Sequence, residues 1–159
     1  RALALDEAYW RALAAAIGTQ LAQAGGSLLV TSSRRTPDWL RAAARRDFAG
    51  IPGRQWHGAE DGENPYAGFL AWADAILATP DSVNLLSEAA ATRAPVFTFA
   101  PRPGGGKVGR FVESLRESGR VRMLGESFDP AEIVPLRETA RVAAAIRAHF
   151  GWEGDERIG

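Results

Sequence analysis

The order of the predicted elements is the strongest constraint on this fold. Five short apolar runs alternate with helical stretches, and each run is followed by a polar turn. The clearest copy has a strand at 73–78, a turn at 79–82 and a helix over 82–92. Such alternation favours a parallel sheet with helices on both faces. The sequence therefore predicts an α/β, Rossmann-like, doubly wound parallel sheet.

The remaining elements continue this order, but a helix comes first. The expected strands are 27–32, 55–57, 74–78, 95–99 and 121–124. Four of the expected helices are 6–24, 82–92, 108–118 and 137–150. A further helix opens at 36–38, with Thr36 as cap and Pro37 at its first position, and another is capped by Asn64 and Pro65. A Rossmann-type half usually starts with its central strand. We therefore expect the first central strand, and a preceding domain, to lie outside this chain, leaving a gap between 28–31 and 75–78.

Composition limits the classes of protein that this chain can be. With 159 residues and 46% hydrophobic side chains, one domain over 1–159 is expected. Basic and acidic residues number 19 each, which disfavours a nucleic-acid partner, and the absence of cysteine excludes disulfides and thiolate metal sites. No apolar run is long enough for a transmembrane segment. We expect a cytoplasmic chain, with peripheral association at the inner membrane left open.

The turns after the predicted strands are the places to look for a ligand, because ligands of open α/β sheets bind at the carboxyl ends of the strands. These turns are 32–36, 58–64, 79–82 and 101–107. The first offers hydroxyls, two guanidiniums and a helix start, which suit phosphate oxygens; its candidate residues are Ser32, Ser33, Arg34, Arg35 and Thr36. The alternative is a capped loop with solvated arginines. Both interpretations stay open.

The other turns supply further candidates. Asp81 and Ser82 open a helix, and a simple N-cap is the favoured explanation of that pair. Glu88 lies about a turn and a half further on, where a carboxylate can accept both hydroxyls of a ribose, although a solvated helix face explains it equally well. Lys107 and Arg110 are candidates to close over an anion.

Several common chemistries do not fit the sequence. The run Gly104–Lys107 lacks the first glycine of a Walker motif, and Val108 stands where a magnesium-binding hydroxyl belongs. No Gly-x-Gly-x-x-Gly motif follows a predicted strand, which disfavours NAD-dependent chemistry in this segment. The acidic loop 60–63 lacks a histidine pattern, so we expect no metal site. His57 ends a strand but has no orienting partner evident in sequence, and the five tryptophans are expected to be packing anchors.

Three motifs are similar to those of the "elongated mitochondria" fission-protein family of plants and its bacterial members. They are Ser-Ser-Arg-Arg-Thr-Pro at 32–37, Gly-Glu-Asn-Pro-Tyr at 62–66, and the stretch 73–90 that contains Asp81-Ser82-Val83 and Ser87-Glu88-Ala89-Ala90. The resemblance continues through 95–96 and 107–111 and covers nearly the whole chain. That family resembles GT-B glycosyltransferases, so the chain resembles their C-terminal half, which binds a nucleotide sugar.

The resemblance implies a ligand cleft shared with a preceding domain. It makes Asn64 a cleft candidate beside Ser32, Arg34, Asp81 and Ser82, and it puts Glu88 where related transferases hold the donor ribose. Glu63, which precedes Asn64 in the second motif, is a further ligand-binding candidate. The first hypothesis is a GT-B-like domain that binds a nucleoside diphosphate sugar, needs no other cofactor and is the donor half of a glycosyltransferase. The alternative is a non-enzymatic interaction module. Epimerase chemistry is disfavoured, because neither Tyr9 nor Tyr66 has a lysine four residues on. Exposed strand edges at the gap also predict self-association.

Overall fold

Helices and strands alternate along the chain as predicted. The computed structural model describes residues 5–100, 105–126 and 133–152. The helices are α1 (Glu7–Ala24), α2 (Asp38–Asp47), the 3-10 helix η1 (Ala59–Asp61), α3 (Tyr66–Trp72), α4 (Val83–Ala90), α5 (Gly106–Glu117) and α6 (Glu138–Phe150); the strands are β1 (Leu28–Thr31), β2 (Gly53–Trp56), β3 (Ile76–Ala78), β4 (Val96–Thr98) and β5 (Val121–Met123). All the described strand pairs are parallel, which confirms the α/β class.

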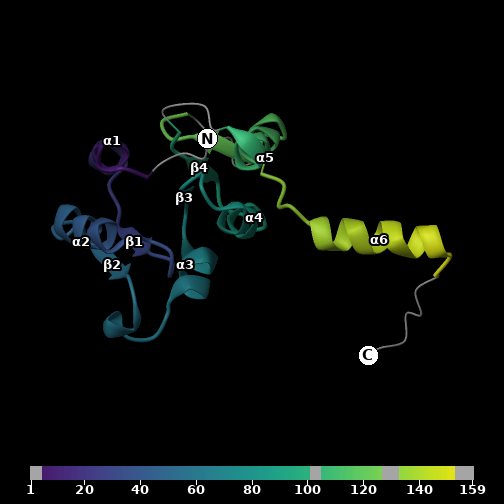
Figure 1. Ribbon diagram of the computed structural model, residues 1–159, viewed down its shortest axis with the longest axis horizontal. Coiled ribbons are helices and arrows are strands. Elements are labelled where there is room, and N and C mark those ends of the chain that lie inside the picture. The colour runs from purple at the N-terminus through teal and green to yellow at the C-terminus, as the bar shows by residue number, and fades with distance from the viewer. Residues whose placement is uncertain (1–4, 101–104, 127–132, 153–159) are drawn as a thin grey trace.

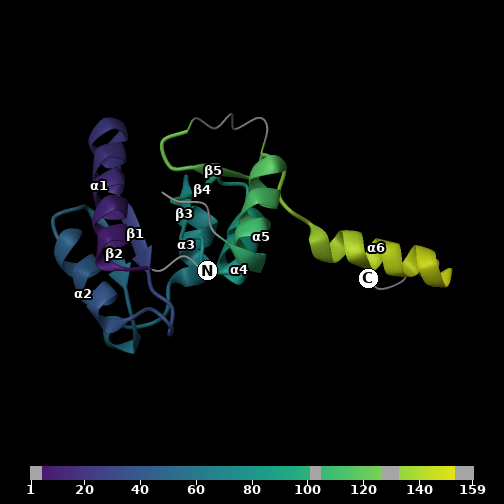
Figure 2. The same cartoon turned by 45° about the horizontal axis from the view of Figure 1, so that its top comes forward.

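The strands form two sheets and not one. β1 pairs with β2, and β3, β4 and β5 pair in that order. Within the described ranges β1 and β3 do not pair with each other, although their sheets lie side by side (Figures 1 and 2). The expected gap in the middle of a Rossmann-like sheet is therefore confirmed.

Helix α1 joins the two sheets across this gap. Its buried residues Tyr9, Trp10 and Leu13 form a core cluster with α2, and partly buried side chains of both sheets, Val30 and Leu77 among them, pack against that cluster. The Tyr9 hydroxyl also donates a hydrogen bond of 2.8 Å to the carbonyl of Phe99, just beyond β4. The apolar face of α1 is thus what fixes one sheet against the other.

A second core lies between the three-stranded sheet and helices α4 and α5. It contains Leu86 and Ala89 from α4, Val112 and Leu115 from α5, and one buried valine from each of β4 and β5. Strands that are covered by helices read as continuous apolar runs. This is why the sequence identified β4 from a short stretch.

The helix starts agree with the sequence in part. Asp6 caps α1 by accepting a hydrogen bond from the Tyr9 amide, and Ser82 caps α4 in the same way. The prediction that Thr36 caps the second helix is wrong. Pro37 occupies the N-cap position without a side-chain cap, and the Thr36 hydroxyl instead accepts a hydrogen bond from the Ser33 amide. The Thr36 hydroxyl is thus used by the turn at 33–36 and does not cap the helix.

The C-terminal helix α6 projects away from the rest of the molecule (Figures 1 and 2). None of its residues is buried. Three tryptophans contradict the expectation that all five are packing anchors: Trp10 is buried, but Trp39, Trp72 and Trp152 are 40%, 85% and 62% exposed. Trp72 ends α3, a helix that lacks fully buried residues, so no core is there to receive it. None of the described helices is long and apolar enough to cross a membrane.

Candidate functional site

The carboxyl ends of the two sheets lie on the same side of the molecule. The first turn of α1 contacts Phe99, which follows the carboxyl end of β4, through the Tyr9 hydroxyl. From there α1 runs back to Ala24 and β1 returns, so β1 also ends on this side. This common edge, formed by the residues that follow β1, β2 and β3, is called the rim below. It is where an open α/β sheet binds ligands.

The turn after β1 is closed by its own hydroxyls. The Thr36 amide donates to the Ser33 carbonyl at 3.0 Å, and the Arg35 amide donates to the Ser33 hydroxyl at 3.2 Å. The Arg41 guanidinium donates to the carbonyls of Ser33 and Arg34 from outside. Ser33 and Thr36 therefore shape the turn, while the exposed side chains of Arg34 and Arg35 are the groups left to meet an anion.

His57 has the orienting partners that the sequence did not reveal. Its ring is 2% exposed, with Nδ1 2.7 Å from the Ser32 hydroxyl and Nε2 3.0 Å from Oε1 of Gln55. An amide oxygen only accepts, so Nε2 carries the proton and Nδ1 accepts from Ser32. Burial, and then the nearby Arg45, lower the pKa of His57, which favours this neutral form. The result is a serine hydroxyl held by a neutral imidazole at the rim.

The acidic loop after β2 is held by a guanidinium. Arg45 donates to both carboxylate oxygens of Asp61, at 2.8 and 2.7 Å, and to Glu60 at 3.1 Å. The bonds from Arg45 to Asp61, together with one from the His57 amide to the same carboxylate, lower the pKa of Asp61 to about 2. Glu63 is exposed beyond them. Within the described ranges no three acidic or histidine side chains gather to hold a metal ion. The bonds from Arg45 indicate a structural role for the loop.

The next turn leads from η1 into helix α3. Asn64 accepts a hydrogen bond of 3.0 Å from the Tyr66 amide, which closes a local turn before α3. The prediction that Asn64 caps this helix is wrong, because Pro65 occupies the N-cap position without a side-chain cap. The Tyr66 hydroxyl then donates to Oε2 of Glu88 on α4. Burial, and next the Glu88 carboxylate, raise the pKa of Tyr66. The structure thus links the Asn64 turn to Glu88 through a single tyrosine.

At the end of β3, Asp81 and Ser82 lie at the start of α4. The Ser82 hydroxyl oxygen accepts a hydrogen bond of 3.4 Å from the Leu85 amide, so its own proton stays available to a ligand. Asp81 lies near Tyr9: burial is the main cause that raises the pKa of Tyr9, and the Asp81 charge adds to it. The N-cap explanation of this pair holds for Ser82.

Lys107 and Arg110 lie in the first turns of α5 and are exposed. The preceding part of their turn, 101–104, lies outside the described residues. Their role toward an anion stays a prediction.

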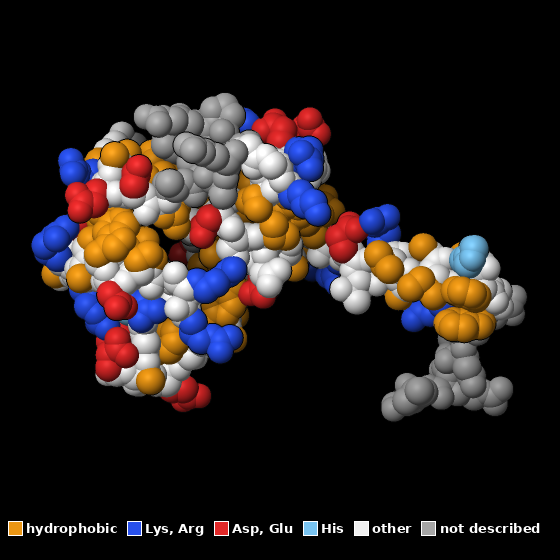
Figure 3. Space-filling model, viewed as in Figure 1, with side chains coloured by type: hydrophobic (Ala, Val, Ile, Leu, Met, Phe, Trp, Pro, Cys, Tyr) orange, Lys and Arg blue, Asp and Glu red, His pale blue; other side chains and the backbone are white. Residues whose placement is uncertain are grey.

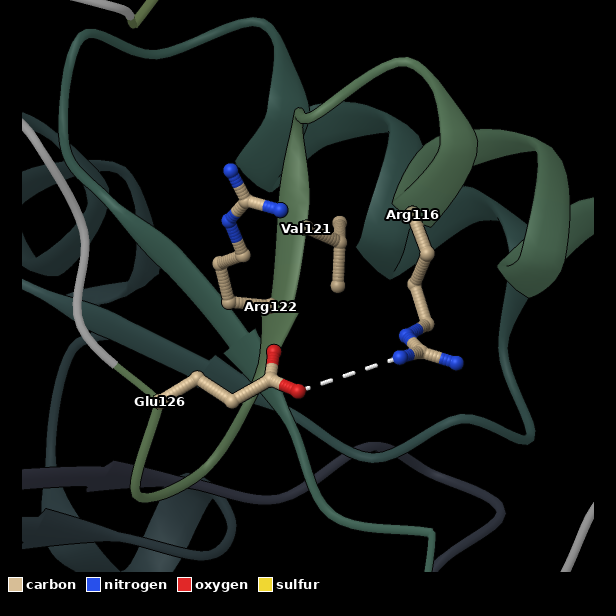
Figure 4. Close-up of a pocket in the computed structure, with 4 residues that line it drawn as sticks. All are labelled: Arg116, Val121, Arg122 and Glu126. Atoms are coloured by element: carbon tan, nitrogen blue, oxygen red, sulfur yellow. Dashed lines mark ion pairs between the residues drawn. The ribbon is translucent and has the colours of Figure 1, made fainter.

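Two hollows on the surface lie away from the rim. One of about 730 Å³ adjoins Asp74 and Pro95, which precede β3 and β4, and so lies at the amino ends of these strands. Another of about 450 Å³ is lined by Arg116, Val121, Arg122 and Glu126 (Figure 4). Here the Arg116 guanidinium pairs with Glu126 at 3.8 Å.

Comparison with known proteins identifies the family. The family model "Mitochondrial fission ELM1" matches residues 1–150. The chain belongs to this family. It is 37% identical over 133 residues to "Mitochondrial fission protein ELM1" of Arabidopsis thaliana, an alignment that covers 81% of this chain and 31% of that protein. It is also 32% identical over 128 residues to "Uncharacterized protein RP120" of Rickettsia prowazekii, covering 74% of this chain and 35% of that protein.

This ELM1-family chain spans about a third of the length of these two relatives. No solved structure matches it. Family membership therefore confirms the resemblance seen in the three motifs, whereas the roles of the rim residues are matters for a proposal.

Proposed function

We propose that this chain binds a nucleoside diphosphate sugar at the rim, as the donor half of a GT-B-like glycosyltransferase. The observation that carries the proposal is the pairing of Tyr66 with Glu88 in the second turn of α4. It holds an exposed carboxylate on the same helix as Ser82, about a turn and a half further along, and the Ser82 hydroxyl at the helix start has a free proton. A ribose and a phosphate are the two groups that such a pair of partners recognises.

In this proposal each rim residue contacts a different part of the ligand. Tyr66 occupies one oxygen of the Glu88 carboxylate, and the other oxygen remains to accept hydrogen bonds from ribose hydroxyls. Ser82 donates to a phosphate oxygen and the guanidinium of Arg34 supplies charge. Ser32 donates to His57, so in this state it orients the turn and does not itself donate to phosphate.

Calorimetry on the full-length protein tests the proposal. UDP-, GDP- and ADP-sugars are titrated separately into the wild type and into Glu88→Ala. Loss of a charge-assisted hydrogen bond to ribose should weaken binding at least about 10-fold. Glu117→Ala, which removes an exposed glutamate from α5, is the matched control and should bind as the wild type does. If none of the sugars binds, or if Glu88→Ala binds unchanged, the proposal fails.

A second candidate function is a non-enzymatic interaction module, and helix α6 favours it. Val142, Ile146 and Phe150 lie four residues apart on α6 and are 43–61% exposed. The Phe150 ring stacks on Trp152 at 5.2 Å. Figure 3 shows apolar side chains along the projecting helix. An uncovered apolar stripe of this kind is typical of a contact surface. The same titrations separate the two candidates, since an interaction module binds no nucleotide sugar.

A further inference from the structure

The contacts of His57 fix the direction of the hydrogen bond that Ser32 makes. The Ser32 hydroxyl lies 2.7 Å from Nδ1 of His57, and Nε2 on the other side of the ring lies 3.0 Å from Oε1 of Gln55. Because an amide oxygen only accepts, Nε2 holds the ring proton and Nδ1 has a lone pair. The single proton of the Ser32 hydroxyl is therefore used in the bond to His57.

Burial of the ring stabilises this arrangement. With the proton on Nδ1, the lone pair of Nε2 would face the oxygen of Gln55, and two buried acceptors would have no donor between them. A doubly protonated ring is also disfavoured, because burial, and then the charge of Arg45, lower the pKa of His57. The nearby carboxylates of Asp61 and Glu60 act in the opposite direction but do not reverse this shift.

The oxygen of Ser32 is left as a hydrogen-bond acceptor at the rim. A hydroxyl oxygen has two lone pairs, and among the described residues no group donates to this one. The donors of the following turn use the hydroxyls of Ser33 and Thr36 instead. Ser32 is half-buried, so a ligand can reach it. Ser82 has the opposite polarity, because its oxygen accepts from the Leu85 amide and its proton is free.

These opposite polarities suit different parts of a nucleotide sugar. The oxygens of an ionised diphosphate only accept, so they match the free proton of Ser82 and not the lone pairs of Ser32. A sugar hydroxyl can donate. The strands that precede the two serines, β1 and β3, belong to separate sheets that lie side by side (Figure 1). With the ribose at Glu88 and the diphosphate at Ser82, the sugar is the part of the ligand left to reach β1.

We propose that Ser32 selects the sugar by accepting a hydrogen bond from one of its hydroxyls, and that His57 is the positioning residue that holds the Ser32 proton away from the ligand. This inference rests on the proposed function and adds which part of the ligand faces β1. A site that is built to accept from a hydroxyl binds an analogue without that hydroxyl more weakly, because the acceptor then loses its donor.

Nitrogen-15 NMR of the histidine side chains in the full-length protein tests the polarity without a ligand. The variant His57→Gln identifies the signals of His57, since it removes them. At about pH 8 we expect a protonated Nε2 and an unprotonated Nδ1. A proton on Nδ1 would overturn the inference, because the Ser32 hydroxyl would then be free to donate to a phosphate.

Calorimetry tests which part of the ligand Ser32 contacts. UDP, GDP and ADP are titrated beside their glucose conjugates, and the pair that binds best is used. Ser32→Ala should weaken binding of the conjugate at least about 5-fold and that of the nucleoside diphosphate less than about 2-fold. Ser114→Ala, which changes an exposed serine of α5, is the matched control and should leave both affinities unchanged.

Conjugates with fluorine in place of single glucose hydroxyls give a second measurement. One of them should bind the wild type at least about 5-fold more weakly and should lose nothing further in Ser32→Ala. This comparison in the wild type needs no variant, so the test stands even if Ser32→Ala fails to fold.

The outcomes separate this inference from the proposed function. If Ser32→Ala weakens the diphosphate and the conjugate equally, Ser32 binds phosphate, and the inference is overturned while the proposed function stands. An unchanged affinity for both ligands also overturns it. If no pair binds the wild type, the proposed function fails and this assignment fails with it.

Discussion

Replacing Arg120 by methionine should destabilise this domain more than any surface substitution. The Arg120 side chain is 3% exposed and lies between the end of α5 and the start of β5. Its Nε donates to the Ala90 carbonyl at 2.7 Å, and one terminal nitrogen donates to the carbonyl of Thr92, also at 2.7 Å. Weaker bonds reach Ala89 and Ala94. One guanidinium thus satisfies the carbonyls that end α4 and lead into β4.

The size of the effect follows from these contacts. A hydrogen bond to a charged group contributes about 1.5–3 kcal/mol, so the two bonds of 2.7 Å set a lower bound of about 3 kcal/mol. Burial also costs free energy, as the lowered pKa of Arg120 shows, which keeps the total below the sum of all four bonds. We expect Arg120→Met to lose about 3–5 kcal/mol of the free energy of unfolding.

Urea denaturation, followed by far-UV circular dichroism, measures this loss. Arg93→Met is the matched control, because Arg93 is an exposed arginine in the loop that Arg120 holds, and its replacement should change the free energy of unfolding by less than about 0.5 kcal/mol. A loss below about 1 kcal/mol for Arg120→Met would refute the assigned role.

Three further predictions follow from the rim. Burial places the pKa of His57 in the folded protein below 6.5, so the stability that comes from its neutral form is complete above that pH and is lost as the pH falls toward the folded pKa. Urea denaturation between about pH 8 and pH 5 should show this loss of stability. The variant His57→Gln should lose this pH dependence. Glu88→Gln should lower the pKa of Tyr66 toward 10.0, measured by ultraviolet titration; an unchanged value contradicts the pairing. Ser82→Ala should cost about 1 kcal/mol in thermal or urea unfolding and Ser82→Gly a few tenths, whereas equal losses would argue against a cap.

The features that sequence predicted well depend on neighbours in the chain. Apolar runs such as 28–30 and 76–78 indicated the strands. Asp6 and Ser82 marked helix starts because a cap acts only on the next turn. The gap between β1 and β3 was predicted as well, since strand order in this class follows from the order of elements.

The features that sequence missed depend on packing between distant residues. Ser32 and His57 are 25 residues apart, and their pairing arises only when β1 and β2 align. The burial of Arg120 depends on the loop after α4, which a local pattern cannot reveal. Thr36 was misassigned because a turn and a helix start compete for the same hydroxyl.

The most direct test of the proposed function is to map a nucleotide sugar on the full-length protein by amide chemical shifts. The rim account predicts that titration with the sugar that binds best shifts the amides of 32–36 and of 81–88 together, since both lie at the ends of the strands. Shifts confined to 91–95, at the hollow beside the amino ends of β3 and β4, or no shifts at all, would contradict it.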